Sequence, residues 1–156
     1  MRIHTLDAEL WLPQTPRELF PFFADAANLQ RLTPASLHFE IITPQPIEMR
    51  VGTLIDYRLR LHHIPLRWRS EITVWDPPTQ FVDTQIRGPY RLWEHTHRFT
   101  AKDGGTLASD HVRYAALGGP LVHRWFVKPD LDRIFAYRSA VLKNIFASGP
   151  VQVGRP

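Results

Sequence analysis

The sequence predicts an α+β domain in which a curved antiparallel sheet of seven strands wraps around one long C-terminal helix. Seven strand-like segments are bounded by turn residues, a strong helix-start signal follows the first of them, and residues 118–147 have a helical spacing of apolar residues. The later strands follow one another without intervening helices, which favours antiparallel hairpins. The sheet can then bury the apolar face of the last helix.

The first two elements are a strand over residues 4–13 and a helix that begins directly after it. Thr15 is a candidate N-cap, Pro16 occupies the first helical position, and Glu18 completes a capping box. This combination predicts a helix start at residue 15.

Proline residues divide the helical region that follows. Pro21 should stop or bend the first helix, and residues 24–34 predict a second short helix that ends before Pro34. Six strand-like segments come next: residues 37–43, 52–63, 65–76, 79–88, 90–101 and 106–117. The two short helices are expected to close one end of the sheet.

Residues 118–147 predict the longest element, a helix that Pro129 interrupts. Asp130 and Asp132 are favourable in a first helical turn, so a kink or two helical segments are expected at this point.

The composition is that of one globular domain, which we place at residues 1–148, with a disordered tail at residues 149–156. There is no cysteine, so disulfides and thiolate chemistry are excluded. Asp7 and Glu9 interrupt the N-terminus where a signal peptide needs an apolar run, and no stretch is apolar enough to span a bilayer. We therefore expect a cytoplasmic protein.

Several sequence segments together resemble the SRPBCC superfamily, the START-like and Bet v 1-like group that includes polyketide cyclase/dehydrase proteins. These segments are LPQTPRELFPFFADAANLQRLTP, VWDPPTQFVD, GPYRLWEHTHRF, GGTLASDHVRY and LGGPLVHRWF. The resemblance implies a helix-grip fold with a cavity between sheet and helix, in which lipids, quinones, sterols or polyketides bind. It implies no single catalytic motif.

The segment RLWEHTHRF places Trp93, His95, His97 and Phe99 at alternate positions, and therefore on one face of a strand. Exposing the two aromatic residues while burying the charged residues between them would cost several kcal/mol, at about 1.5–3 kcal/mol for each large apolar side chain. We predict that all four side chains face the inside of the curved sheet.

Asp110 and Tyr114 share a face of the next strand and are expected beside the two histidines. This group of side chains can orient a ligand oxygen, or it can be a structural network that satisfies itself. In an enzyme, His95 or His97 would move a proton while Asp110 or Tyr114 orients the imidazole or polarises a carbonyl. Two imidazoles and a carboxylate could also hold zinc or iron, but the spacing is unspecific, so we expect no metal and no cofactor.

The hairpin over residues 52–76 carries four arginines on the face opposite to its aromatic residues. If Leu61 faces Leu66, the loop is HHIP and the arginines lie opposite one another, which predicts a surface basic patch of Arg58, Arg60, Arg67 and Arg69. The patch is either a solvated face or a docking site for an anionic membrane or an acidic protein. Nucleic acid is disfavoured because the aromatic residues lie on the other face.

These observations lead to a primary hypothesis and two alternatives. The primary one is a carrier or sensor that binds a small, mainly apolar molecule, such as a lipid, an isoprenoid or quinone, or a polyketide-like compound, in an internal cavity. The alternatives are a cyclase or dehydratase-type enzyme and an interaction module that uses the arginine patch. The expected cavity residues are Tyr57, Leu59, Trp68, Trp93, His95, His97, Phe99, Asp110, Tyr114 and Trp125.

Overall fold

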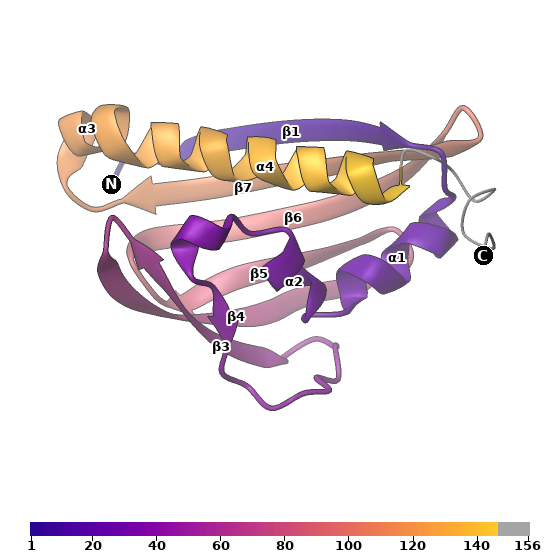
Figure 1. Ribbon diagram of the computed structural model, residues 1–156, viewed down its shortest axis with the longest axis horizontal. Helices are drawn as coiled ribbons and strands as arrows, with labels where there is room; N and C mark the ends of the chain where they lie inside the picture. Colours follow the sequence, from indigo (N-terminus) through magenta and orange to yellow (C-terminus); the bar gives the residue numbers. More distant parts are fainter. Residues whose placement is uncertain (147–156) are drawn as a thin grey trace.

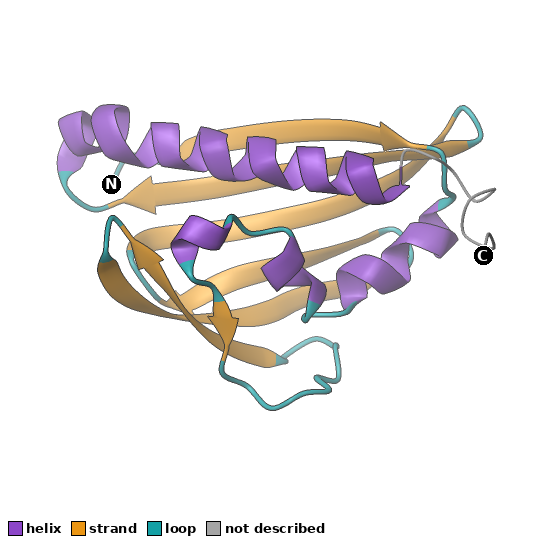
Figure 2. Ribbon diagram, viewed as in Figure 1, coloured by secondary structure: helices purple, strands orange, loops and turns teal. Residues whose placement is uncertain are grey.

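The computed structural model describes residues 1–146, which form one seven-stranded antiparallel sheet and a long C-terminal helix (Figures 1 and 2). The predicted fold class is confirmed, whereas the expected tail at residues 149–156 lies outside the described residues. The strands are β1 (His4–Leu12), β2 (Glu40–Ile41), β3 (Leu54–Leu61), β4 (Ile64–Asp76), β5 (Gln80–Arg87), β6 (Tyr90–Lys102) and β7 (Gly105–Ala116). The helical segments are α1 (Pro16–Ala24), α2 (Asn28–Arg31), η1 (Ala35–Leu37), α3 (Gly119–Val122), η2 (His123–Val127) and α4 (Lys128–Phe146).

The strand order is β1-β7-β6-β5-β4-β3-β2, so each strand from β3 to β7 pairs with its neighbours in sequence while β1 joins the far edge. In Figure 1, α4 runs along the β1 and β7 side of the sheet, and α1 and α2 lie lower down on the same side of the sheet. The space between these helices and the middle strands is where a ligand site can form.

The first helix begins with the predicted capping box. The Glu18 amide donates to Thr15 Oγ1 at 3.2 Å, and the Thr15 amide donates to Glu18 Oε1 at 3.0 Å. Pro21 lies inside α1 and does not stop it, because the helix continues to Ala24. Pro21 is exposed, so water can bond the Arg17 carbonyl that lacks an amide partner.

The C-terminal helical course passes through Pro129 without ending. α3 is followed by η2, a segment of π-helix over five residues, and Pro129 is the second residue of α4. Pro129 has no amide to donate, and the π-helical segment directly before it changes the hydrogen-bond pattern at this point. The predicted interruption therefore takes the form of a change in helical hydrogen bonding before Pro129.

The β3–β4 hairpin differs from the predicted register. Leu61 pairs with Ile64, which leaves a two-residue turn of His62 and His63 with φ angles of 50° and 67°. Two consecutive positive φ angles are typical of a type I′ turn, whose twist matches that of the flanking strands. The four-residue HHIP loop is therefore wrong, and the register shifts by two residues.

Among residues 1–146, no helix has both the length and the apolar run needed to cross a bilayer. The cytoplasmic location stays a prediction.

Candidate functional site

A cavity of about 200 Å³ lies between the sheet and the helices. The apolar residues that line it include Phe22, Phe23, Leu29, Leu32, Phe39, Ile55, Leu59, Leu66, Trp68, Trp93, Leu131, Ile134 and Phe135. The polar residues include Tyr57, Ser70, Asp83, His95, His97, Asp130 and Arg138. A mainly apolar wall with a few polar groups is typical of small-molecule sites.

Strand β6 presents the predicted face to the interior. Trp93, His95, His97 and Phe99 are 8, 7, 6 and 4% exposed. Glu94, from the opposite face, pairs with Arg113 at 3.1 Å on the outside. The predicted orientation of β6 is confirmed.

The two histidines belong to a buried cluster that three strands and α4 build. His95 pairs across the sheet with Asp83 of β5, and His97 pairs with Asp110 of β7. The two imidazole rings stack with centroids 3.7 Å apart. Arg138 of α4 reaches into the same group and completes what we call the His–Asp cluster: Asp83, His95, His97, Asp110 and Arg138.

Asp110 forms one side of this cluster. Its Oδ1 lies 2.8 Å from His95 Nε2 and 3.6 Å from His97 Nδ1. The Arg138 guanidinium approaches both carboxylate oxygens at 3.3 Å. This side therefore contains a carboxylate, two imidazole nitrogens and a cation.

Asp83 forms the other side. Its Oδ2 lies 2.6 Å from His97 Nε2 and 3.9 Å from His95 Nδ1. Within the described residues, Asp83 has no salt bridge to lysine or arginine. The two sides of the cluster thus have the same groups, except that the Asp83 side has no permanent cation.

The hydrogen bonds fix the tautomers of both rings. Arg138 Nη2 can only donate, and it lies 3.4 Å from His97 Nδ1, so Nδ1 accepts and His97 Nε2–H donates to Asp83. His95 Nε2–H donates to Asp110. His95 Nδ1 then carries a lone pair and has no hydrogen-bond partner among the described residues.

Burial and neighbouring charges set the protonation states. Desolvation, followed by repulsion from His95, lowers the pKa of His97 to about 4. Burial alone would raise the pKa of Asp110, but Arg138 and the hydrogen bond from His95 outweigh it and hold that pKa well below its usual range. For Asp83, burial is the largest single effect and would raise the pKa, but the hydrogen bond from His97 together with the nearby charges, including Arg138, lowers it. His97 is therefore neutral and both carboxylates are ionised near pH 7.

Six of the ten expected cavity residues line the cavity together: Tyr57, Leu59, Trp68, Trp93, His95 and His97. Ser70 Oγ lies 3.1 Å from both the Tyr57 hydroxyl and Trp68 Nε1, so these polar atoms are already partnered. Burial raises the pKa of Tyr57, which stays protonated.

Three other expected cavity residues, Phe99, Asp110 and Tyr114, are not part of the cavity wall. Phe99 packs against Phe20 and Phe23. The Tyr114 hydroxyl lies 2.8 Å from His123 Nε2, away from the His–Asp cluster. The structure thus brings His95, His97 and Asp110 together, as expected, and leaves Tyr114 apart.

Trp125 differs from the prediction, because its side chain is exposed and does not line the cavity. The buried side of α4 contains Leu131, Phe135 and Leu142. At about 100° per residue, Trp125 lies roughly 120° around the helix from Leu131, even before the π-helical turn is considered. The prediction therefore placed Trp125 on the wrong face of the C-terminal helix.

The arginine hairpin also differs from the prediction. In the observed register, Arg67 lies opposite Arg58 and Pro65 lies opposite Arg60. Arg58 makes two hydrogen bonds to Glu40 at 3.0 and 3.1 Å.

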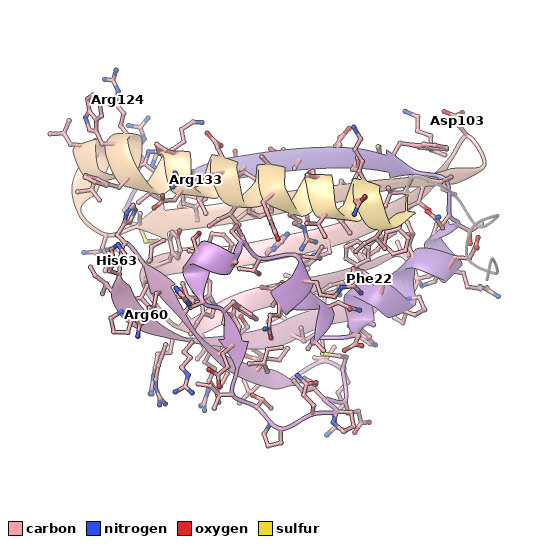
Figure 3. The ribbon with its side chains drawn as sticks, viewed as in Figure 1. Phe22, Arg60, His63, Asp103, Arg124 and Arg133 are labelled. Carbon is pink, nitrogen blue, oxygen red and sulfur yellow. The ribbon has the colours of Figure 1, made fainter. Side chains whose placement is uncertain are left out.

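Arg69 lies opposite Asp56 and bonds it at 2.7 and 3.0 Å. Figure 3 shows Arg60 near the end of the hairpin, on the outside of the molecule. The predicted patch of four facing arginines is therefore two ion pairs with Arg60 and Arg67 beside them.

The hairpin end is held against α4 by one polar contact. His62 Nε2 lies 2.7 Å from Asp130 Oδ2, and Arg133 also bonds Asp130. Asp130 is buried and lines the cavity. This contact closes the gap between β3–β4 and α4 beside the cavity.

Sequence reasoning missed Asp83 and Arg138, and both left a signal. Asp83 alternates with Phe81 in its strand, and so shares the inward face. Arg138 follows Leu131 by seven residues and precedes Leu142 by four, which places a cation in the middle of an apolar helical stripe.

The fold is the Bet v 1-like helix-grip fold. Among solved structures, Ara h 8.0201 matches with 21% identity and a TM-score of 0.60, over 91% of this chain and 99% of that chain. Ginseng major latex-like protein 151 from Panax ginseng matches with 12% identity and a TM-score of 0.65, over 92% and 97%. Protein TTHA0849 from Thermus thermophilus matches with 16% identity and a TM-score of 0.66, over 90% and 92%. No protein-family model and no curated protein sequence matches the chain.

Proposed function

We propose that this protein is a carrier or sensor that binds a compact, mainly apolar molecule with one polar group in its internal cavity. The observation that carries the proposal is the cavity itself, which has aromatic and aliphatic walls and one polar end at the His–Asp cluster. Its volume of about 200 Å³ is below the 300–1,000 Å³ range common for ligand pockets. The volume therefore favours a small ring system over a long acyl chain.

His95 Nδ1 is the group that would recognise the polar end of the ligand. It lines the cavity side of the cluster, has a lone pair, and lacks a partner within the described residues. A ligand hydroxyl that donates to this nitrogen gains one hydrogen bond, which is worth about 0.5–1.5 kcal/mol net. The site therefore favours an alcohol or phenol over a hydrocarbon of the same shape.

Binding of 2-naphthol, compared with naphthalene, tests this proposal directly. We expect saturable binding of 2-naphthol, followed by its own fluorescence, and weaker binding of naphthalene. Leu59→Phe fills part of the cavity and should weaken binding roughly tenfold or more, equivalent to about 1.4 kcal/mol.

Leu54→Phe is the matched control, because Leu54 is exposed on the same strand and does not line the cavity. Equal affinity of the wild type and Leu59→Phe would overturn the proposed site, as would the absence of any saturable binding in a screen of compact alcohols and phenols.

An enzymatic role has one specific observation in its favour. Asp110 orients His95 so that the free Nδ1 faces the cavity, which is the arrangement of a general base held by a carboxylate. Exchange of the α-protons of 2-tetralone with deuterated water, followed by NMR, tests for proton abstraction. Exchange that the protein accelerates and His95→Gln abolishes would support catalysis, whereas the background rate in both would exclude it for this ketone.

A further inference from the structure

The two sides of the His–Asp cluster are nearly equivalent in their ligating atoms but not in charge. Each side has one carboxylate with two imidazole nitrogens close to it, at 2.8 and 3.6 Å on the Asp110 side and at 2.6 and 3.9 Å on the Asp83 side. Arg138 supplies a cation to Asp110 alone. The cluster therefore contains two carboxylates and one guanidinium, and within the described residues no lysine or arginine forms a salt bridge with Asp83.

We propose that Asp83, His95 and His97 form a binding site for one divalent transition-metal ion at the polar end of the cavity. The ligand atoms are an Asp83 carboxylate oxygen, His95 Nδ1 and His97 Nε2, and ligating atoms of these three residues lie within 4.8 Å of one another. Two imidazoles and one carboxylate suit zinc or iron(II) and leave coordination positions open. The proposal reverses the sequence-based expectation of no metal. It needs no organic ligand, but it uses the same His95 Nδ1 lone pair, so the metal ion and the ligand hydroxyl are alternative partners of this nitrogen.

The present distances are compatible with this assignment. A tetrahedral ion about 2.1 Å from each ligand separates the ligand atoms by roughly 3.4 Å. The separations from Asp83 Oδ2 are 2.6 Å to His97 Nε2 and 3.9 Å to His95 Nδ1, on either side of that value. Coordination through Nε2 requires the His97 proton to move to Nδ1, which ends its hydrogen bonds with Asp83 and Arg138. The His97 ring must also turn from its stacking on His95.

The opposite side of the cluster already has the features of an outer coordination shell. Metal-bound histidine usually donates its other ring N–H to a carboxylate, which fixes the tautomer and the ring orientation. Asp110 Oδ1 lies near the far nitrogen of both rings, His95 Nε2 and His97 Nδ1. Arg138 holds Asp110 in place and neutralises it, so this cation supports the site without occupying it.

Metal binding by the chelator-treated full-length protein tests the proposal, with Zn²⁺ alone and Co²⁺ alone as probes. We expect one Zn²⁺ per chain by calorimetry, and a visible Co²⁺ spectrum typical of a four- or five-coordinate nitrogen and oxygen site. Asp83→Asn, His95→Gln and His97→Asn should each weaken Zn²⁺ binding on the order of 100-fold or more, whereas Asp110→Asn should weaken it about 10–100-fold.

His111→Asn is the matched control. His111 bonds Asp7 in another histidine–carboxylate pair, but at the surface and without a second imidazole. This variant should bind Zn²⁺ as the wild type does. Loss of binding in His111→Asn, or wild-type affinity in Asp83→Asn and His97→Asn, would overturn the proposal.

A measurement on the wild type removes any dependence on how the variants fold. In nitrogen-15 NMR of the imidazole rings, Zn²⁺ should shift His95 Nδ1 and His97 Nε2 and leave the His111 and His62 rings unchanged. Absence of Zn²⁺ binding by the wild type, or shifts confined to other histidines, would show that the Asp83 side takes only a proton. Because no organic ligand is present, failure here leaves the naphthol experiment unaffected.

Discussion

Arginine pairs with aspartate in two regions of this molecule, and burial rather than bond length distinguishes them. On the β3–β4 hairpin, Arg69 lies 2.7 Å from Asp56, and the two side chains are 41 and 37% exposed. Between α4 and β7, Arg138 lies 3.3 Å from Asp110, and the side chains are 7 and 15% exposed. Removing one partner of the longer pair should cost more in the free energy of unfolding, because the remaining charge is buried, unpaired and out of reach of water.

Arg138→Met gives the largest expected effect. It leaves Asp110 and Asp83 as two buried carboxylates without a guanidinium, which should cost about 3–5 kcal/mol in the free energy of unfolding. Urea denaturation followed by tryptophan fluorescence measures it. The double variant Arg138→Met with Asp110→Leu should recover much of the lost free energy of unfolding. If Arg138→Met alone costs less than about 1 kcal/mol, the buried and exposed ion pairs do not differ as argued.

Asp83→Asn should have a smaller effect in the metal-free protein. The substitution loses a charge-assisted hydrogen bond with His97, which is worth about 1.5–3 kcal/mol. It also removes the one carboxylate of the cluster that lacks a cation, and this offsets part of the loss. We expect Asp83→Asn to lower the free energy of unfolding of the chelator-treated protein by about 1 kcal/mol. A loss equal to that of Arg138→Met would show that the two sides of the cluster are electrostatically alike.

In both regions, the face of the sheet on which each side chain lies could be predicted from the local sequence, but the contacts between side chains could not. Alternation placed His95 and His97 inside, because a strand face has a fixed period. Which carboxylate meets which imidazole depends on the registers of β5 and β7 with β6, and on the rotation of α4 that brings in Arg138. These are long-range properties, as is the volume of the cavity.

The hairpin shows the same limit on a smaller scale. Arginines on one outer face could be predicted from alternation, but their partners depend on the turn. A two-residue turn, rather than the expected four, moved Arg69 from opposite Arg58 to opposite Asp56. A like-charge contact thereby became an ion pair.

Arg69→Ala is expected to lower the stability at neutral pH less than the substitutions in the buried cluster, because both partners of this ion pair are partly exposed. The hydrogen bond from Arg69 lowers the pKa of Asp56 in the folded state. The stabilisation from this pair is therefore complete above the ordinary value of 3.8 and is lost as the pH falls through the lowered pKa. Thermal unfolding of the wild type and Arg69→Ala from pH 7 to pH 2 measures this effect, and the difference in their melting temperatures should shrink below pH 4. If that difference stays constant, the stabilisation comes from the alkyl chain of Arg69 and not from its charge.

Arg58→Ala should give the smallest effect, because its partner Glu40 is on the two-residue strand β2 and both side chains are more than half exposed. Salt separates this region from the buried cluster most directly. The Debye length falls to about 3 Å at 1 M salt, so the effect of Arg58→Ala should disappear there, whereas the water-excluded contact of Arg138 with Asp110 is screened much less. Urea denaturation of both variants at 0.1 M and 1 M sodium chloride measures the contrast. A salt response of Arg138→Met as large in proportion as that of Arg58→Ala would mean that water reaches Asp110.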